Sequence, residues 1–281
     1  MLPARWIWEA VIDQALREDI GHGDVTTLAL IPPEQRGRLR VLAEAPLVVA
    51  GLPALPLIFA VLGETVTVTA RVTDGTPVAA GAELARLEGP ARALLTGERV
   101  ALNLIEHLSG ISTFTRRVVE AVAPWGTRIL DTRKTTPGLR ALEKYAVRVG
   151  GGTNHRMGLD AAVLIKDNHI AAVGSVAEAV RRTRAAVGPT LFVEVECDSL
   201  EQVAEALEAG PDGILLDNMT PPQLQEAVHL IGGRVFTEAS GGVSPANVAE
   251  VAATGVDAIS LGALTHSAPW APVTAEWEDL P

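Results

Sequence analysis

Apolar and polar positions follow helix and strand spacing in the first part of the chain. Residues 5–17 place apolar side chains at helical intervals, which predicts an amphipathic helix. Residues 36–90 alternate with a period of two and contain an Asp-Gly turn signal, so they predict β-strands. A long helix is predicted over residues 91–122, with an apolar face formed by Leu102, Ile105, Leu108, Ile111 and Phe114.

The pattern changes at residue 128, where short apolar runs begin to alternate with helical segments. The runs are Arg128–Leu130, Ala162–Ile165, Leu191–Val195, Gly213–Leu216, Arg234–Phe236 and Asp257–Leu261. Helical spacing occupies residues 175–187, 199–209, 221–230 and 244–254. This alternation predicts β/α units on a parallel sheet. Because six strands are too few for a closed eight-stranded barrel, we expect an open (incomplete) α/β barrel, with a doubly wound sheet as the alternative.

Composition narrows the class of protein. The chain has 281 residues, of which 48% are hydrophobic and 20% charged, as in globular proteins. No apolar run is long enough to span a membrane, and Glu9 and Asp13 interrupt the N-terminal stretch, so we expect no signal peptide. A single cysteine, Cys197, excludes an internal disulfide and is interpreted as a buried packing thiol. These features are typical of a soluble, cytoplasmic protein.

Charge is unevenly distributed along the chain. The net charge of −11 argues against nucleic acid or a membrane surface as a partner, yet residues 128–166 carry eight basic and three acidic side chains. All three lysines, Lys134, Lys144 and Lys166, fall in this segment. It therefore predicts a pocket for a small, highly charged anion. Lys144 also shares one face of a predicted helix over 137–149 with Arg140 and Arg148, and that face either lines the site or is solvated.

Polar side chains follow every predicted strand of the barrel, at the ends where parallel α/β proteins collect their chemistry. They are Asp131–Lys134, Lys166–His169, Glu194 with Glu196, Asp217–Asn218, Glu238–Gly242 and Ser260–Gly262. Glu194 and Glu196 lie two positions apart, so both should face the barrel interior. Asp217 could join them around Mg²⁺; the alternative is a buried ion pair, for example with Lys166.

Two further features favour an anion site. Ser240, Gly241 and Gly242 lie between a strand and a helix start, which suits a phosphate, and Gly262 could add a backbone contact. Arg133 and Lys134 follow the first strand of the barrel, and His155-Arg156 follow three glycines. Arginine suits carboxylates and lysine suits phosphates. The four histidines His22, His107, His229 and His266 show no metal-binding spacing.

Seven segments together resemble the quinolinate phosphoribosyltransferase family, the carboxylating nicotinate-nucleotide pyrophosphorylases. They are EDIGHGDVTT, GERVALNLIEHLSGI, DTRKTTPGLRALEKYAVRVGGGTNHRMGL, LIKDNHI, VEVE, ILLDN and EASGG. A related branch associated with molybdenum transport shares much of this pattern and is the nearest alternative. A non-catalytic phosphate-binding barrel is a second alternative, but it leaves the interior acids unexplained.

The resemblance implies an N-terminal α/β sandwich domain over residues 1–110, completed by 267–281, and an open α/β barrel over 111–266 that carries the active site. It implies the reaction of quinolinate with phosphoribosyl pyrophosphate to give nicotinate mononucleotide, pyrophosphate and CO₂ in de novo NAD biosynthesis. Mg²⁺ is the expected cofactor, and no organic cofactor is expected. The expected assembly is a homodimer with shared active sites, or a higher oligomer.

The resemblance also assigns residues by position. Arg133, His155, Arg156 and Lys166 match the quinolinate pocket, and Lys134 lies beside the phosphates. Arg99 matches an arginine given across the dimer interface. Glu196 and Asp217 match acids near ribose and Mg²⁺, although Glu194 is an alternative to Glu196. The 5′-phosphate site is matched by Ser240, Gly241, Gly242 and Gly262. The residues expected to be catalytic are Lys134, Lys166, Glu196 and Asp217.

Overall fold

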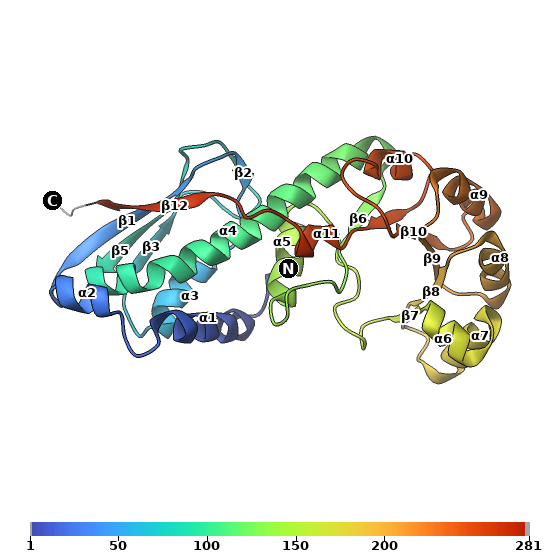
Figure 1. Cartoon of the computed structure of the whole chain (residues 1–281), viewed down its shortest axis with the longest axis horizontal. Coiled ribbons are helices and arrows are strands. Elements are labelled where there is room, and N and C mark those ends of the chain that lie inside the picture. The colour runs from blue at the N-terminus through green and yellow to red at the C-terminus, as the bar shows by residue number, and fades with distance from the viewer. Residues whose placement is uncertain (1, 279–281) are drawn as a thin grey trace. The chain divides into compact units, whose positions relative to one another are not determined.

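The computed structural model describes residues 2–278, which its contacts divide into two units (Figure 1). The first unit contains the chain up to Arg116, Thr135–Gly151 and the residues from Ser267 onward. The second contains Arg117–Lys134 and Gly152–His266. This division differs from the expected boundaries, because residues 111–116 and 135–151 group with the first unit. No helix among the described residues has the length and apolar character needed to cross a membrane.

An antiparallel sheet forms one layer of the first unit. Its order is β12-β1-β5-β3, from Val273–Glu278, Arg36–Ala43, Glu83–Pro90 and Thr67–Ala70. The short strands β2 (Leu47–Val48) and β4 (Pro77–Val78) form a separate pair. The predicted alternation is confirmed in β1, which buries every second residue. The β prediction for 36–90 is wrong at Ala54–Val61, which forms helix α3 and buries Leu55, Ile58 and Phe59. Because β12 pairs with β1, residues near the end of the described chain complete this sheet.

Helices form the other layer of the first unit. They are α1 (Arg5–Ile20), α2 (Val25–Leu30), α3 (Ala54–Val61), most of α4 (Ala91–Val122) and α5 (Arg140–Val149). The predicted long helix has the bounds of α4, and its interior residues Ile105, Leu108 and Ile111 are fully buried. Helix α5 belongs here because it buries Leu142, Ala146 and Val147, and Tyr145 donates a hydrogen bond to Asp74 at 2.7 Å.

The second unit is built on six parallel strands in the order β6-β11-β10-β9-β8-β7. Their bounds are Arg128–Leu130, Ala258–Ser260, Phe236–Ser240, Gly213–Asp217, Val193–Cys197 and Val163–Ile165. From β7 to β11, neighbours in the sheet are also neighbours in the chain, whereas a doubly wound sheet would reverse direction. The sheet ends at β6 and β7 and does not close. An open α/β barrel is therefore confirmed, and the doubly wound alternative is wrong.

Helices cover the outer face of this sheet (Figure 1). They are α6 (Asp167–Val173), α7 (Val176–Ala186), α8 (Leu200–Ala209), α9 (Pro221–Ile231) and α10 (Val248–Ala252). The short α11 (Ala263–His266) follows β11, and a 3₁₀ turn, Ala123–Trp125, precedes β6. The buried residues Val193, Val195 and Cys197 of β8 lie on the helix-covered side. The interpretation of Cys197 as a buried thiol is confirmed, and burial raises its pKa to about 12.

The opposite face of the sheet changes character along the strands. At the amino ends of the strands, Phe192 and Phe236 pack edge to face. The Arg128 guanidinium lies 4.9 Å from the centre of the Phe236 ring. Gly213 leaves this space open, because a Cβ there would lie 2.9 Å from the Phe192 ring. Two residues further on, β8 and β10 carry Glu194 and Glu238 on the same face. An apolar floor is thus followed by acidic side chains toward the carboxyl ends.

Candidate active site

The carboxyl ends of β7 and β8 bring Lys166 and Glu196 together. The Lys166 ammonium lies 2.5 Å from a carboxylate oxygen of Glu196. The Lys166 side chain is 45% exposed and that of Glu196 is 13% exposed, so the pair sits at the rim of the barrel. The ion-pair interpretation of the interior acids therefore agrees with the contact between Glu196 and Lys166, except that this pair lies at the rim and is not buried.

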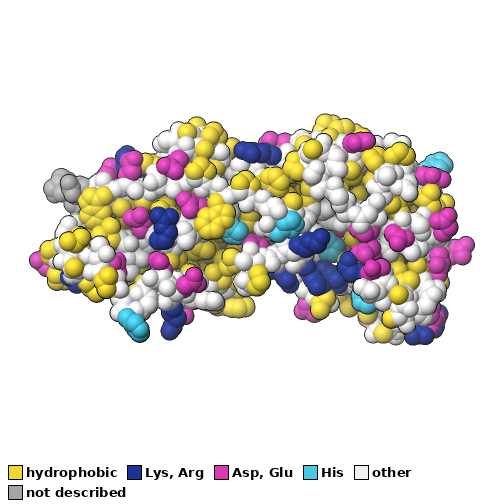
Figure 2. Space-filling view, in the orientation of Figure 1, with side chains coloured by type: hydrophobic (Ala, Val, Ile, Leu, Met, Phe, Trp, Pro, Cys, Tyr) yellow, Lys and Arg dark blue, Asp and Glu magenta, His cyan; other side chains and the backbone are white. Residues whose placement is uncertain are grey.

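Arg156 and Arg133 form a cationic part of the same unit. The Arg156 guanidinium donates to the Ala162 carbonyl at 3.0 Å, just before β7. Burial lowers the pKa of Arg156, and the positive charge of Arg133 lowers it further. Two guanidinium groups close enough to disfavour each other's charge are stabilised when an anion binds between them. Figure 2 shows Lys and Arg side chains gathered in a dense group on the face in view.

Lys134 and Gly262 lie together after β6 and β11. Thr265 donates its hydroxyl hydrogen to the Lys134 carbonyl at 2.7 Å. A Cβ at Gly262 would lie 2.9 Å from the Lys134 side chain and 3.1 Å from Nε2 of His266. The absence of a side chain at position 262 therefore makes room for Lys134. His266, to which the sequence assigned no role, is part of this corner of the barrel.

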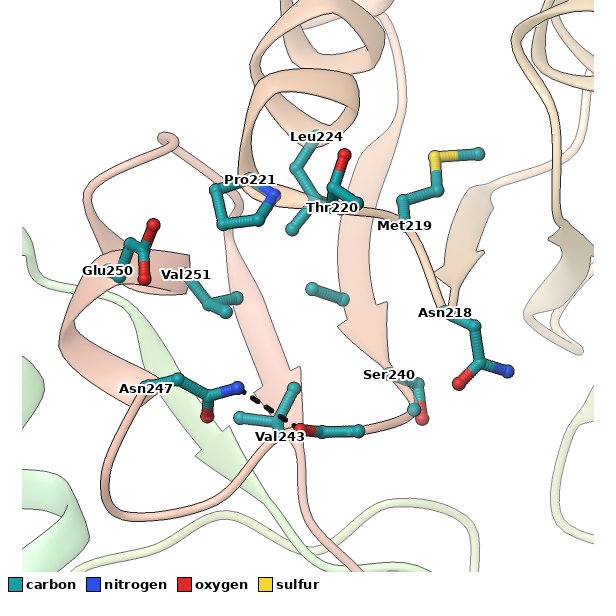
Figure 3. Close-up of a pocket in the computed structure, with 13 residues that line it drawn as sticks. Asn218, Met219, Thr220, Pro221, Leu224, Ser240, Val243, Asn247, Glu250 and Val251 are labelled. Atoms are coloured by element: carbon teal, nitrogen blue, oxygen red, sulfur yellow. Dashed lines mark hydrogen bonds between the residues drawn. The ribbon is translucent and has the colours of Figure 1, made fainter.

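The Ser-Gly-Gly turn borders a cavity of about 250 Å³ (Figure 3). Gly241 and Gly242 have φ values of 84° and 64°, and a Cβ at Gly241 would collide with the Asn218 side chain. Ser240, Gly241 and Gly242 line this cavity, whereas Lys134 and Gly262 do not. The other lining residues are Asn218, Met219, Thr220, Pro221, Leu224, Ala239, Val243, Asn247, Glu250 and Val251.

Asp217 lies two residues closer to the rim, along β9, than the position level with Glu196. Leu215 pairs in register with Glu196, and Asp217 follows on the same face of β9, where it accepts a hydrogen bond from Asn218 at 2.5 Å. Asp217 and Glu196 are both partly exposed. Carboxylate oxygens on one face and near solvent suit Mg²⁺, which keeps waters and takes phosphate oxygens as further ligands. The two acids therefore fit the expected cation.

A buried cluster below the rim was missed from the sequence. Nε2 of His155 lies 3.2 Å from Glu194 and 3.6 Å from Glu238, and the two glutamates are 2% and 1% exposed. Burial, together with the negative charge of Glu194, raises the pKa of Glu238 to about 7. The same alternation that singled out Glu194 and Glu196 in β8 places Glu238 two residues before Ser240 in β10 and could have found it.

Four cations that the sequence singled out lie in the first unit. Arg99 is exposed on α4, and Arg140, Lys144 and Arg148 belong to α5. Lys144 is fully buried and Arg148 is exposed, so these three residues do not form one solvated face. Arg140 donates to the Thr135 hydroxyl at 3.0 Å.

An open parallel barrel with cations, carboxylates and a glycine turn at its strand ends defines a phosphate-handling α/β-barrel protein. The model for the quinolinate phosphoribosyl transferase C-terminal domain matches residues 111–274, and the model for the N-terminal domain of the same family matches residues 24–109. The chain therefore belongs to the quinolinate phosphoribosyltransferase family, as the resemblance of its motifs predicted.

Individual relatives agree with this assignment. The chain is 46% identical over 272 residues to a probable nicotinate-nucleotide pyrophosphorylase [carboxylating] from Synechocystis, covering 96% of this chain and 92% of the relative. It is 49% identical over 262 residues to the nicotinate-nucleotide pyrophosphorylase [carboxylating] of Mycobacterium leprae, covering 91% and 92%. The crystal structure of NadC from Streptococcus pyogenes superposes with a TM-score of 0.96 at 39% identity, covering 100% of both chains.

Proposed function

We propose that this protein transfers the phosphoribosyl group of phosphoribosyl pyrophosphate to quinolinate and releases CO₂, forming nicotinate mononucleotide and pyrophosphate in de novo NAD biosynthesis. The observation that carries the proposal is the pairing of Arg133 with Arg156, next to β7, in a barrel whose β10 ends in the Ser-Gly-Gly turn. Quinolinate carries two carboxylates, and the co-substrate carries a phosphate and a pyrophosphate. Family membership supports the same conclusion.

The residues at the rim divide the work between the two substrates. Arg133, Arg156 and Lys166 bind the carboxylates of quinolinate, and Lys134 stabilises the phosphates. The backbone of Ser240, Gly241 and Gly242, with Gly262, holds the 5′-phosphate. These assignments use charge and position, since lysine and arginine suit the anions that each would meet.

The chemistry proceeds by displacement at the anomeric carbon of ribose. As the bond to pyrophosphate breaks, positive charge develops on the ribose, and Glu196 and Asp217 stabilise it. The quinolinate nitrogen forms the new bond and becomes cationic. Loss of the adjacent carboxylate as CO₂ leaves an electron pair on the ring carbon beside that positive nitrogen. A proton then bonds to this carbon. Because the ring is its own electron sink, no organic cofactor is needed.

Mg²⁺ is part of the proposal, with Glu196 and Asp217 as the residues that would hold it. When bound, it would neutralise charge on the leaving pyrophosphate. Lys166 contacts Glu196 at 2.5 Å and so holds this carboxylate at the rim. The proposal also includes a cytoplasmic enzyme, which cell fractionation would test.

The decisive assay is release of CO₂ from carboxyl-labelled quinolinate that depends on phosphoribosyl pyrophosphate. We expect release with quinolinate and none of the corresponding transfer to nicotinate, because a site built for two carboxylates leaves cations unpaired with one. Arg156→Ala should lower kcat/KM for quinolinate by about 100-fold or more. Arg181→Ala is the matched control, since Arg181 is exposed on α7 and pairs with Glu178 at 2.5 Å. Comparable use of nicotinate would contradict the assigned substrate.

We further propose a homodimer in which Arg99 completes the active site of the partner subunit. The exposure of Arg99 on α4 supports this role. Mixing inactive Arg99→Ala and Lys166→Ala proteins should restore activity to roughly one quarter of wild type, because half of the dimers are heterodimers with one intact site. No recovery after verified subunit exchange would show that Arg99 acts within its own chain.

A further inference from the structure

The cluster of His155, Glu194 and Glu238 lies below the rim. Among the described residues these three side chains bring one potential metal-ligand atom each to within 4.8 Å of one another. Of the four carboxyl oxygens, Glu194 Oε2 is the one that contacts the imidazole within hydrogen-bond distance, at 3.2 Å. Glu194 Oε1 and both oxygens of Glu238 are buried without a hydrogen-bond partner. Buried carboxylates of this kind are costly unless a cation or a proton compensates them.

The imidazole of His155 distinguishes between these two possibilities. The backbone N–H of Arg156 donates to Nδ1 at 2.7 Å, so Nδ1 carries a lone pair and no hydrogen. In neutral histidine the ring hydrogen must then sit on Nε2, where it points at Glu194. A metal ion on Nε2 would move that hydrogen to Nδ1, directly against the Arg156 N–H. The geometry therefore favours a proton in the cluster over a metal ion.

Glu238 is the group best placed to carry that proton. It is 1% exposed and faces Glu194 on β8 and His155 in the loop between α5 and β7. Asp131 at the end of β6 adds a second negative charge. The nearby Ser260 hydroxyl on β11, which donates its hydrogen to Ser240, acts in the opposite direction and lowers the pKa of Glu238. An ionised Glu238 would thus face two carboxylates with a single imidazole between them. Consistent with this, the pKa of Glu238 is raised to about 7, chiefly by burial.

The backbone around His155 makes the cluster relevant to the substrate pocket. The His155 N–H donates to Asp131 at 2.9 Å, and Arg156, the next residue, donates to Nδ1 of the ring. The ring therefore connects the buried acids to the main chain of Arg156. A change in the protonation of the ring would break the contact that sets the start of the Arg156 side chain.

We propose that Glu238, as a neutral carboxylic acid beside the Glu194 carboxylate, is a positioning residue that keeps His155 in the neutral form with hydrogen on Nε2 and thereby fixes Arg156 in the quinolinate pocket. This inference rests on the proposed function for the identity of the pocket's ligand. The protonation state of the imidazole is independent of the proposed function, because it can be measured without turnover.

The direct test is the state of the His155 ring in the intact, uniformly ¹⁵N-labelled protein. Two-bond ¹⁵N–¹H correlations distinguish the two neutral forms and the imidazolium, and His155→Gln identifies the signal. We expect the neutral form with hydrogen on Nε2 at pH 6.5, unchanged in Glu238→Gln, which mimics the protonated acid. An imidazolium, or hydrogen on Nδ1, in the wild type would overturn the proposal. So would stoichiometric Zn²⁺ or Mn²⁺ bound to metal-stripped protein and lost in Glu238→Gln.

The kinetic test compares pH profiles. Above pH 7 Glu238 releases its proton to solvent, and the ionised carboxylate then competes with Glu194 for the Nε2 hydrogen of His155. The ring shifts and its Nδ1 contact with the Arg156 N–H weakens, so KM for quinolinate should rise roughly fivefold, the size of one hydrogen bond. This rise should be absent in Glu238→Gln, with kcat little changed. Glu143→Gln is the matched control, because it alters a buried glutamate that also faces a histidine and should keep the rise. Equal profiles for wild type and Glu238→Gln would overturn the proposal.

The two tests separate failure of the inference from failure of the proposed function. A wild-type protein that does not decarboxylate quinolinate but shows the expected His155 ring state contradicts the proposed function alone. A protein that decarboxylates quinolinate but holds His155 in another state contradicts the inference alone. If Glu238→Gln does not fold, the ring state of the wild type still decides the question.

Discussion

Each unit of the molecule packs a partly exposed histidine against buried glutamate, and the two arrangements are opposite in what they leave unpaired. In the first unit, Glu143 is fully buried, and its two oxygens accept from His107 Nε2 at 3.0 Å and from the Thr136 N–H at 3.1 Å. The unpaired atom there is Nδ1 of the His107 ring. In the second unit both ring nitrogens of His155 have partners, and three carboxyl oxygens have none.

The difference separates a contact that holds a fold from one that serves a site. A carboxylate whose oxygens are both hydrogen-bonded is compensated where it stands, and its loss would mainly cost stability. Carboxyl groups left without partners below a pocket store an electrostatic cost that a proton or a ligand can relieve. The same two residue types therefore have different functions, and the decisive feature is which atoms remain unsatisfied.

The largest effect should come from the rim acids Glu196 and Asp217. Both are partly exposed, so they can be substituted without leaving a cavity in the core. Glu196→Gln and Asp217→Asn should each lower kcat by about 100-fold or more, because each removes a charge that stabilises the developing positive ribose. Melting temperatures should shift by only about 2 °C. Near-normal turnover in either variant, measured by CO₂ release, would show that the acid is structural.

A smaller effect, and one of a different kind, is expected in the first unit. Glu143→Ala leaves His107 and the Thr136 N–H without their acceptor, so the free energy of unfolding should fall by about 1–3 kcal/mol. Urea denaturation of wild type and variant measures this difference. If Glu143→Ala reduced turnover strongly while stability stayed unchanged, the contrast between the two histidine clusters would fail.

The last effect is a pH dependence of stability in the second unit. The pKa of Glu238 is about 7 in the folded protein and 4.5 ordinarily, so between these values the folded state holds more protons than the unfolded state. Glu238 therefore makes stability fall as pH rises through this window. Glu238→Gln lacks the titrating group, so its stability relative to wild type should increase from pH 4.5 to pH 7 and then level off. A difference that does not vary with pH would contradict the raised pKa.

The sequence predicted the barrel well because its signals are local. Each strand of the second unit overlaps its predicted apolar run, and the polar residues after the strands lie at one end by the geometry of parallel sheets. That residues 135–151 belong to the first unit could not be predicted in the same way. Lys144 is buried although its helical spacing resembles a solvated face, and Tyr145 meets Asp74, 71 residues away. Contacts at such separations leave no periodic trace.

The site shows the same limit. Alternation placed Glu194 and Glu196 on one face, but it could not decide which of them pairs with Lys166, 30 residues before Glu196. Glu238 carried the same signal as the two acids of β8 and was given no role. The sequence did not show that Glu238 on β10 lies close to Glu194 on β8. The register between strands is fixed by packing and cannot be read from either strand alone.

The pairing of β12 with β1 constrains the order in which this protein can fold during synthesis. Arg40 of β1 contacts Glu276 of β12, 236 residues later in the chain. A chain made from its N-terminus therefore exposes an unpaired edge of β1 while all six strands of the second unit are translated. Such an edge is a template for pairing with other chains, so nascent protein is most open to misassembly before β12 leaves the ribosome. The second unit, whose last element is α11, can be complete first.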